Sequence, residues 1–375
     1  MFLKELELYY FRNYIQEVLK FSENKIILLG DNAQGKSNLL EAIELLSSLK
    51  SHRYSKDIDL VYHQGVYGQI KAKISNGYVD HDLGIIIPAK GKRELFVNSE
   101  KVKRNLDFLG IINTVLFSNL DLDLVRGAPE YRRNWVDNLL IQIEPIYWHI
   151  IKDYHHVLKQ RNALLKKFKK AGYDHNLSSS ADLELQLWDE KLAETASRVK
   201  RRRARVITKI QPLARFWHHQ ISQKTEKLVI KYAPNVLWQE DTPENVQQLI
   251  RENLAEKRLA EINLGTTLVG PHRDEIEFII NDNLARSYGS QGQQRTLVLA
   301  LKLAELQIIE QVTGDCPLLL LDDVMAELDI KRQQQLLDCL GDRFQTIITT
   351  THLNCFNKNL LHQAQIVKVD GGKFN

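Results

Sequence analysis

The stretch Gly30-Asp31-Asn32-Ala33-Gln34-Gly35-Lys36-Ser37 decides the fold of this chain. It fits the phosphate-loop pattern G-x-x-x-x-G-K-[ST], follows the apolar segment 25–29 and precedes an amphipathic segment that runs to about Leu49. A strand, a glycine-rich loop and a helix in this order place backbone N–H groups and the positive helix end around phosphates. The sequence therefore predicts an α/β nucleotide-binding domain.

Two side chains of the loop have specific expected tasks. Lys36 should reach the β- and γ-phosphates of ATP, and Ser37 should supply a hydroxyl ligand to Mg²⁺, which prefers oxygen ligands. We expect the whole loop to contact the nucleotide, through Gly30, Asp31, Asn32, Ala33, Gln34, Gly35, Lys36 and Ser37.

A second motif lies almost 300 residues later, where four leucines at 318–321 precede Asp322 and Asp323. This pattern indicates a buried parallel strand that delivers carboxylates at its C-terminal end, where α/β sheets bind ligands. Asp322 should hold Mg²⁺ directly or through water, and Asp323 should orient or deprotonate the attacking water. Two acids after a strand are often an ordinary strand-to-loop junction, and the phosphate loop makes the catalytic interpretation the stronger one.

The segment SYGSQGQQR at 287–295 opens a long apolar-periodic stretch and resembles the signature of ABC-type ATPases. Ser290 should cap the helix and leave backbone N–H groups exposed to phosphate, although simple helix capping would leave the same pattern. We expect nucleotide contacts from Ser290, Gln291, Gly292 and Gln293. Further resemblances are Ala326-Glu327-Leu328-Asp329 to the D-loop and His352 to the switch histidine, which gives His352 a catalytic role.

In ABC-type ATPases, the signature of one subunit closes on ATP that is held by the phosphate loop of another. The resemblance therefore implies an ATP-dependent homodimer whose two composite sites are identical by symmetry. ATP binding and hydrolysis would then switch the dimer on and off.

Length and composition set broad limits on the chain. With 375 residues, 43% of them hydrophobic and 26% charged, it is expected to be globular, with two or three structural units. No apolar run approaches the roughly 20 residues of a membrane span, and residues 1–10 lack the features of a secretion signal, so we expect a cytoplasmic location. The expected division is 1–120 for the first part of ATPase lobe I, 121–285 for lobe II with a helical arm, and 286–375 for the rest of lobe I.

Periodicity separates a strand-rich first third from a helical middle. Helical spacing extends over 129–215 and is interrupted at 171–181, where Gly, Asn and Ser accumulate. Two helices joined there would form a short arm, with limbs of about 30 residues and roughly 45 Å. Strands are expected at 2–10, 14–21, 25–29, 67–74, 81–87, 94–97, 114–117, 227–232, 318–321, 345–350 and 365–369, and further helices at 243–262, 291–312 and 330–340.

The net charge of +4 is unevenly distributed. Residues 150–215 contain 16 Lys and Arg against 7 Asp and Glu, a net +9, which leaves −5 on the rest of the chain. This density of basic residues predicts a surface that binds the phosphates of a nucleic acid without preference for a base sequence. A basic helix that is merely solvated would have the same composition. The candidate DNA contacts are Lys166, Lys167, Lys169, Lys170, Arg201, Arg202, Arg203 and Arg205.

Over most of its length the chain resembles the RecF recombination-mediator family. The matching segments are 38–43, 51–53, Arg132-Arg133 with Asp137, 270–274 and 289–295. The resemblance implies an ABC-type P-loop ATPase head similar to SMC heads, with a mixed sheet and a short helical arm. It also implies ATP and Mg²⁺ as cofactors, slow hydrolysis, and binding to duplex DNA and single-strand/double-strand junctions. RecR, and functionally RecO and RecA, are the implied partners.

Two departures from the family pattern stand out. Ala33 occupies a position where glycine is more frequent, which would strain the loop if this residue needs a positive φ. Residues 117–122 contain no glutamine that could act as a transporter-like Q-loop, and we assign this segment no function.

Three other classes of function compete with an ATP-switched DNA-binding dimer. The main alternative is a nucleotide-switched scaffold whose basic arm binds a protein or RNA partner. A metabolic phosphotransferase would leave the signature segment and the basic arm without a use. A transporter motor would need a membrane segment on another chain.

Overall fold

The computed structural model describes residues 1–53, 56–63, 65–77, 79–172, 179–327, 333, 341, 343–354, 356 and 358–375. The chain forms two compact units. The first contains 1–122, 220–224 and 298–375, and the second contains 123–219 and 225–297. The signature segment at 287–295 falls in the second unit by this division, whereas the sequence-based boundaries placed it with the carboxylate strand.

One sheet of the first unit is antiparallel, with the order β2-β1-β4-β5-β6-β7. Its strands alternate between buried and exposed residues, as in β1, where Leu6 and Leu8 are fully buried while Glu5 and Glu7 lie on the opposite face. The elements are β1 (Phe2–Phe11), β2 (Tyr14–Lys20), β4 (Tyr67–Ser75), β5 (Asp80–Pro88), β6 (Glu94–Val97) and β7 (Glu100–Val102), with helix α2 (Asp57–Leu60) and a 3-10 turn at Asn105–Asp107.

The other sheet of the first unit has the order β15-β14-β3-β13-β12-β8 and is mixed, because only β14 and β15 pair in antiparallel fashion. The strands at 25–29 and 318–322 are nearly continuous apolar runs, as expected for parallel strands that are covered on both faces. Its elements are β3 (Lys25–Leu29), β8 (Thr114–Phe117), β12 (Leu318–Asp322), β13 (Thr346–Thr350), β14 (Ala364–Asp370) and β15 (Lys373–Phe374), with helices α1 (Lys36–Ser48), α10 (Val324–Glu327) and α12 (Lys358–Gln363).

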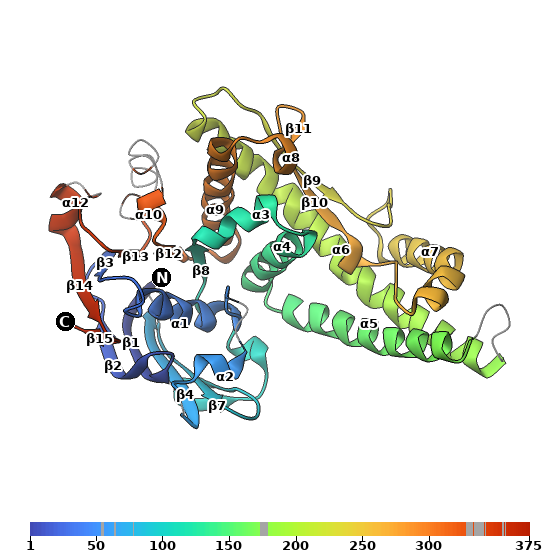
Figure 1. Cartoon of the computed structure of the whole chain (residues 1–375), viewed down its shortest axis with the longest axis horizontal. Coiled ribbons are helices and arrows are strands. Elements are labelled where there is room, and N and C mark those ends of the chain that lie inside the picture. Colours follow the sequence, from blue (N-terminus) through green and yellow to red (C-terminus); the bar gives the residue numbers. More distant parts are fainter. Residues whose placement is uncertain are drawn as a thin grey trace. The chain divides into compact units, whose positions relative to one another are not determined.

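The strand order brings the two ends of the chain together. β13 lies between β3 and β12, so the strand before the phosphate loop and the strand before Asp322 are separated by one strand only (Figure 1). Both sheets share one core with α1, which includes Leu6, Ile26, Leu40 and Leu320. This core fixes the positions of the strand ends at which ligands bind in parallel sheets.

The second unit is mainly helical and carries a three-stranded antiparallel sheet with the order β11-β10-β9. Trp135 of α4 packs edge-on against Phe278 of β10, with ring centroids 5.8 Å apart. The elements are α3 (Asp123–Arg126), α4 (Pro129–Ile143), α5 (Tyr147–Lys170), α6 (Ser179–Ile221), β9 (Leu228–Ala233), α7 (Pro243–Leu264), β10 (Glu275–Ile280), β11 (Asn283–Leu284), α8 (Ala285–Tyr288) and α9 (Gln291–Thr313), with a 3-10 turn at Pro271–Arg273. The last two residues of α6, the part of α9 from Val298 onward and a 3-10 turn at Asn119–Leu122 belong to the first unit.

The helical arm differs in detail from the expected hairpin. Its limbs α5 and α6 have 24 and 43 residues instead of two similar lengths, and α7 packs against them as a third helix (Figure 1). Arg161 of α5 joins all three helices, because its fully buried guanidinium pairs with Asp189 of α6 and with Glu261 of α7, each at 2.7 Å. Periodicity indicates helices but cannot show which of them share such a contact.

The expected strands and helices are confirmed where the structure describes them. The helix expected at 330–340 lies outside the described residues, except for Gln333, as do Leu328 and Asp329 of the D-loop-like segment. Within the described residues, no helix combines the length and apolar character that crossing a membrane requires.

Candidate nucleotide-binding site

The phosphate loop connects β3 to α1, and its backbone conformation is special at two positions. Gly35 has φ 120°, and a Cβ at this position would lie 2.7 Å from the side-chain amide of Asn13, so glycine is required there. Ala33 has φ 66°, in the left-handed region. The departure noted in the sequence therefore falls on a position that does need a positive φ, and the Cβ of Ala33 strains it.

The lysine of the motif is folded over its own loop. Lys36 is 4% exposed, and its Nζ donates to the carbonyl oxygens of Gly30 at 2.6 Å and Asp31 at 2.8 Å. These bonds hold the ammonium group at the mouth of the loop, where the sequence predicts phosphate contacts. They also hold the loop in a curved shape.

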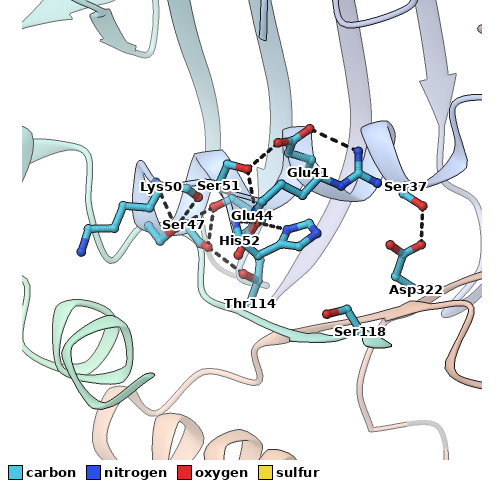
Figure 2. A network of polar contacts seen from close by, with 12 residues as sticks. Ser37, Glu41, Glu44, Ser47, Lys50, Ser51, His52, Thr114, Ser118 and Asp322 are labelled. Atoms are coloured by element: carbon cyan, nitrogen blue, oxygen red, sulfur yellow. Dashed lines mark hydrogen bonds and ion pairs between the residues drawn. The ribbon is translucent and has the colours of Figure 1, made fainter. Parts of the chain in front are cut away.

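The serine of the loop meets the first aspartate of the leucine-rich strand. Ser37 Oγ donates to Asp322 Oδ1 at 2.7 Å, across 285 residues of sequence (Figure 2). Thr349 of the intervening strand β13 donates to the same Asp322 oxygen at 2.9 Å. A hydroxyl and a carboxylate at this separation are oxygen donors of the type that Mg²⁺ binds, so these residues fit the metal that the motif implies.

Asp323 is positioned by its backbone. Its φ is 55°, and its N–H donates to Thr349 Oγ1 at 2.8 Å. Burial raises the pKa of the Asp323 carboxyl, and the neighbouring charge of Asp322 raises it further, while Lys36 opposes the shift. A carboxylate with a raised pKa is a better proton acceptor, which suits the expected role toward water.

His352 follows β13 at the same edge of the sheet. Its side chain is exposed, and its Nδ1 lies 2.7 Å from Thr351 Oγ1. The structure thus places Lys36, Ser37, Asp322, Asp323 and His352 at or just beyond the C-terminal ends of three adjacent parallel strands.

Residues that the sequence analysis missed support the loop from the β1–β2 turn and from the C-terminal end. Asn13 Nδ2 donates to Gln34 O at 2.9 Å, and Tyr14 Oη donates to Gly35 O at 2.9 Å. Gly372 N donates to the same Gln34 oxygen at 2.9 Å. The polar run Arg12-Asn13 inside an otherwise strand-like pattern was the available signal, but nothing in it indicates what it contacts.

A polar network behind α1 ties the segment after this helix to the site (Figure 2). Glu41 of α1 accepts two hydrogen bonds from Arg12, at 2.8 and 2.7 Å, and contacts Ser51. His52 Nδ1 lies 2.6 Å from Glu44 Oε2; burial lowers the pKa of His52, but the contact with Glu44 outweighs this effect and the pKa is raised. The RecF-like segment 51–53 is therefore anchored on the helix that starts at the phosphate loop.

The unassigned segment after β8 begins at the sheet edge that carries Asp322. Figure 2 shows Ser118 below Asp322. Ser118 N donates to Asp121 Oδ2 at 2.7 Å, and Asp121 also pairs with Lys302 Nζ at 2.9 Å. These bonds fix the turn, and they give it no chemical role beyond that.

The signature segment in the second unit is a capped helix start. Gln293 N donates to Ser290 Oγ at 3.2 Å while Ser290 N donates to Gln293 Oε1 at 2.8 Å, which forms a reciprocal capping box. The side chains of Ser290 and Gln291 are exposed, and Tyr288 is 74% exposed. Gly289 is packed so closely that a Cβ would lie 2.6 Å from Ala285 O.

The side chain of Gln293 has partners within the chain, and its expected contact with the nucleotide stays a prediction. Its amide oxygen accepts from Ser290, and its amide nitrogen donates to Glu226 Oε1 at 2.9 Å. The side chain therefore positions the turn and is not available for a phosphate, although the backbone N–H groups at the helix start remain suitable. Gln294 adds a second anchor, because it bonds to the carbonyl oxygens of Ala285 and Gly289.

The basic run at 200–205 does not form the surface that its composition predicts. Arg203 is 2% exposed and pairs through Nε and Nη2 with both oxygens of Asp137, at 2.9 and 2.8 Å. Lys200 is fully buried against Asp274 at 2.5 Å. The prediction that Arg203 contacts DNA is therefore wrong, because its charge is used inside the fold.

The other arginines of the run also have carboxylate partners. Arg201 and Arg205 pair with Asp241 at 2.6 and 2.7 Å, and Arg202 pairs with Glu144 at 2.8 Å. These pairs lie nearer to solvent and reduce the charge available to a phosphate. The four lysines at the end of α5, Lys166, Lys167, Lys169 and Lys170, are exposed.

The RecF-like segments of the second unit meet at this buried network. Asp137 belongs to one segment and Asp274 to another, and they receive Arg203 and Lys200 respectively. Arg132 pairs with Glu275 at 2.8 Å. Motifs that are far apart in the sequence are thus partners in one set of buried ion pairs.

Comparison with known proteins agrees with the fold. Residues 2–373 match the family described as "RecF/RecN/SMC N terminal domain". The solved Smc head domain of Pyrococcus furiosus, bound to the C-terminal domain of ScpA, has a TM-score of 0.54 and 16% identity, covers 100% of this chain and 95% of its own, and shares the fold. The fold and the site define an ATPase head of the ABC and SMC type, with a phosphate loop, a carboxylate strand and a signature helix.

More similar proteins specify the family. The chain is 58% identical over 380 residues to "DNA replication and repair protein RecF" of Gloeothece citriformis (strain PCC 7424), covering 100% of this chain and 99% of the relative. It is 56% identical over 372 residues to the protein of the same name from Microcystis aeruginosa (strain NIES-843 / IAM M-2473), covering 99% of each. The solved "recombination mediator protein RecF-ATPrS in RecFOR pathway" has a TM-score of 0.90 at 34% identity and covers 100% of this chain and 97% of its own. The chain belongs to the RecF family.

Proposed function

We propose that this protein is an ATP-switched DNA-binding protein of recombinational repair and replication restart, which works as a homodimer with ATP held between the two copies. The observation that carries the proposal is the bond between Ser37 and Asp322, at 2.7 Å, beside Asp323. It joins two motifs that have no common use outside a phosphate site. A related structure is described as RecF with ATP in the RecFOR pathway, at 33% identity and a TM-score of 0.89.

In this proposal the first unit binds ATP and Mg²⁺. The loop N–H groups and Lys36 bind the phosphates, and Ser37 and Asp322 hold Mg²⁺, which would neutralise charge on the β- and γ-phosphates. Asp323 orients the attacking water and accepts its proton, and His352 contributes from the end of β13. Hydrolysis is slow and acts as a switch.

The second unit supplies the surface that closes on a partner's nucleotide. Ser290 and Gln291 are exposed at the start of α9, and the capping box fixes the direction of its first N–H groups. The positive end of a helix is a favourable place for a phosphate. Two copies related by a twofold axis would complete two sites at once, which makes the dimer depend on ATP.

Sedimentation of the protein with ATP, ADP or a nonhydrolysable analogue tests the composite site. We expect dimers with ATP and with the analogue, and monomers with ADP. Ser290→Arg should abolish the dimer while the monomer still binds ATP, because the bulky cation occupies the phosphate position. Gln248→Arg, which adds the same charge at an exposed position of α7, is the control. Dimers that persist in Ser290→Arg would refute the composite site.

Lys36→Arg tests the loop itself. A planar guanidinium does not replace a compact ammonium group that is enclosed by two carbonyl oxygens, so this variant should bind ATP poorly or fail to hydrolyse it. Equilibrium binding of a fluorescent ATP analogue measures the first outcome, and phosphate release measures the second. Normal binding together with normal turnover would contradict the assignment.

DNA is the proposed macromolecular partner, as duplex and at single-strand/double-strand junctions. The name shared by the relatives, "DNA replication and repair protein RecF", supports this proposal. The exposed Lys166, Lys167, Lys169 and Lys170 form the proposed contact, since phosphate binding needs basic density and no base code. RecR is the proposed direct protein partner, and RecO and RecA are the proposed functional ones.

A nucleotide-switched scaffold that binds a protein or RNA is the second candidate. It is favoured by one observation: Arg201, Arg202, Arg203 and Arg205 are paired with carboxylates of the chain. Gel filtration with ATP, with and without gapped DNA, separates the two candidates. Co-elution of gapped DNA with the ATP-bound dimer supports the first, and its absence at low salt supports the second.

A further inference from the structure

The start of α9 has two backbone N–H groups that the fold does not use. Ser290 N and Gln293 N are bonded to each other's side chains in the capping box, and Gln294 N donates to Ser290 O at 2.9 Å. Within the described part of the chain, the N–H groups of Gln291 and Gly292 have no partner. These two groups are therefore the backbone donors that this helix start can offer to a phosphate.

The direction of these two N–H groups depends on the capping box. The box fixes the backbone at Ser290, whereas Gly292 lacks a Cβ and adds no restriction of its own. The box closes only when the amide oxygen of Gln293 faces Ser290 N, because the amide nitrogen is a donor and cannot accept. The two ends of a glutamine amide have nearly the same shape, so another group in the fold must decide which end faces Ser290.

The carboxylate of Glu226 makes this decision. Glu226 Oε1 accepts from Gln293 Nε2 at 2.9 Å, while Gln293 Oε1 accepts from Ser290 N at 2.8 Å. An ionised carboxylate only accepts hydrogen bonds, so it binds the amide nitrogen and excludes the amide oxygen. The side chain of Gln293 can therefore satisfy Glu226 and Ser290 in one orientation only, which is the orientation that closes the capping box.

The other oxygen of Glu226 faces a buried histidine of α6. His218 is fully buried, and its Nε2 lies 3.5 Å from Glu226 Oε2. Burial lowers the pKa of His218, Glu226 opposes this shift and His219 adds to it, so the imidazole is neutral at neutral pH. A neutral ring does not draw the carboxylate away from Gln293 as a cation would. Glu226, whose side chain is 17% exposed, is thus held between His218 and Gln293.

The turn before the capping box has anchors of its own. Gln294 Nε2 donates to Ala285 O at 3.2 Å and to Gly289 O at 3.1 Å. Gln294 Oε1 accepts from Arg126 Nε at 2.5 Å. Since none of these bonds involves Glu226, its removal should release the capping box and leave the preceding turn in place.

We propose that Glu226 is a positioning residue for the ATP-dependent dimer. It orients the amide of Gln293, which closes the capping box and directs the N–H groups of Gln291 and Gly292 toward the phosphates of ATP held by a second copy of the chain. Glu226 acts through Gln293, 67 positions away in the sequence, and makes no nucleotide contact of its own. This inference rests on the proposed dimer.

Sedimentation of the full chain against a nonhydrolysable ATP analogue tests the effect on the dimer. Glu226→Ala should raise the analogue concentration for half-maximal dimerisation by about tenfold, because the orienting hydrogen bond to a charged group is lost. The affinity of the monomer for ATP, measured at a protein concentration too low for dimers, should not change. Glu226→Gln keeps an acceptor oxygen for Gln293 Nε2 and should restore dimerisation to within about threefold of the unchanged protein.

A double variant tests whether Glu226 acts through Gln293. In the Gln293→Ala background, Glu226→Ala should raise the analogue concentration by no more than about twofold further, since the side chain that it orients is already absent. Asp189→Ala is the matched control. Its carboxylate is 14% exposed and pairs with Arg161, so its loss also removes a nearly buried contact of the second unit, but in the arm and not at the signature turn. This control should leave dimerisation unchanged.

Residue-resolved hydrogen exchange tests the positioning step without the dimer. The N–H of Ser290 is bonded to the side chain of Gln293. It should exchange about tenfold faster in Glu226→Ala than in the unchanged protein, because the bond opens more often, and at nearly the original rate in Glu226→Gln.

Three results would overturn the proposal while the unchanged protein still forms dimers. They are dimerisation of Glu226→Ala at the original analogue concentration, additive losses in the double variant, and an equal loss in Asp189→Ala. If the unchanged protein forms no dimer, the proposed function fails, and the exchange of the Ser290 N–H alone decides whether Glu226 positions the turn. Faster exchange in Glu226→Ala then supports the positioning role, and equal exchange overturns it.

Discussion

The phosphate loop of the first unit and the basic run of the second unit are both short, conspicuous stretches of sequence, but their polar groups end in opposite situations. At the loop, Ser37, Asp322 and Asp323 remain partly exposed at a sheet edge, where a ligand can reach them. In the basic run, Lys200 and Arg203 are buried against Asp274 and Asp137. The phosphate loop acts through its local backbone geometry, so its expected function survives folding. Basic side chains, by contrast, can be neutralised by carboxylates from distant parts of the chain, as Lys200 and Arg203 are.

The largest effect is expected for a substitution in the buried ion pair between Arg203 and Asp137. Asp137→Ala leaves the Arg203 guanidinium buried without its bidentate partner, so the free energy of unfolding should fall by about 3–5 kcal/mol. Asp241→Ala is the matched control, because it removes the exposed partner of Arg201 and Arg205 and should lower the free energy of unfolding by about 0–1 kcal/mol. Urea denaturation measures both, and equal losses would break the distinction.

Asp323→Asn tests the partly exposed nucleotide site of the first unit. An amide cannot accept the proton of the attacking water, so ATP turnover should fall by about 100-fold or more, while ATP-dependent dimers persist. Since burial and Asp322 raise the pKa of Asp323, the carboxylate is ionised only above this raised pKa, and turnover of the unmodified protein should decline as the pH falls through it. Phosphate release at a series of pH values measures this, and undiminished turnover in the variant would exclude Asp323 as the base.

The exposed lysines of α5 test whether the remaining basic density binds DNA. Reversing Lys166, Lys167, Lys169 and Lys170 to Glu should weaken duplex binding, and it should lower the slope of log affinity against log salt by about 1 for each lost phosphate contact. Reversing Lys90, Lys92 and Lys103, which are exposed in the first unit, is the control. An unchanged salt dependence in the first variant would place the DNA surface elsewhere.

The smallest effect is expected for a substitution of Ala33 in the phosphate loop. Ala33 has φ 66°, so Ala33→Gly should relieve strain and raise the free energy of unfolding by about 0.5–1 kcal/mol. The same substitution at Ala255, exposed in the middle of α7, should lower it by about 1 kcal/mol, because glycine is unfavourable inside a helix. Thermal unfolding of both variants shows whether the two shifts have opposite signs.

The parts of the site that depend on local sequence could be predicted, and the parts that depend on long-range contacts could not. The strand, loop and helix around Lys36 follow from local pattern, and so does the strand that ends at Asp322. The support from Asn13 and Gly372 could not be predicted, because these residues meet the loop only through strand order. The bond from the Gln293 side chain to Glu226 could not be predicted either, because these two residues are 67 positions apart in the sequence.

By itself, the sequence determined the class of fold, the phosphate loop, the carboxylate strand and the helix that carries the signature, because each depends on short-range periodicity and on backbone conformations that only certain residues adopt. The tertiary structure alone decided that β13 separates β3 from β12, that α7 joins the arm, and that Lys200 and Arg203 are internal. The physical reason is that burial and pairing depend on which distant carboxylate is brought within reach. Charge in a sequence has no partner until the chain has folded.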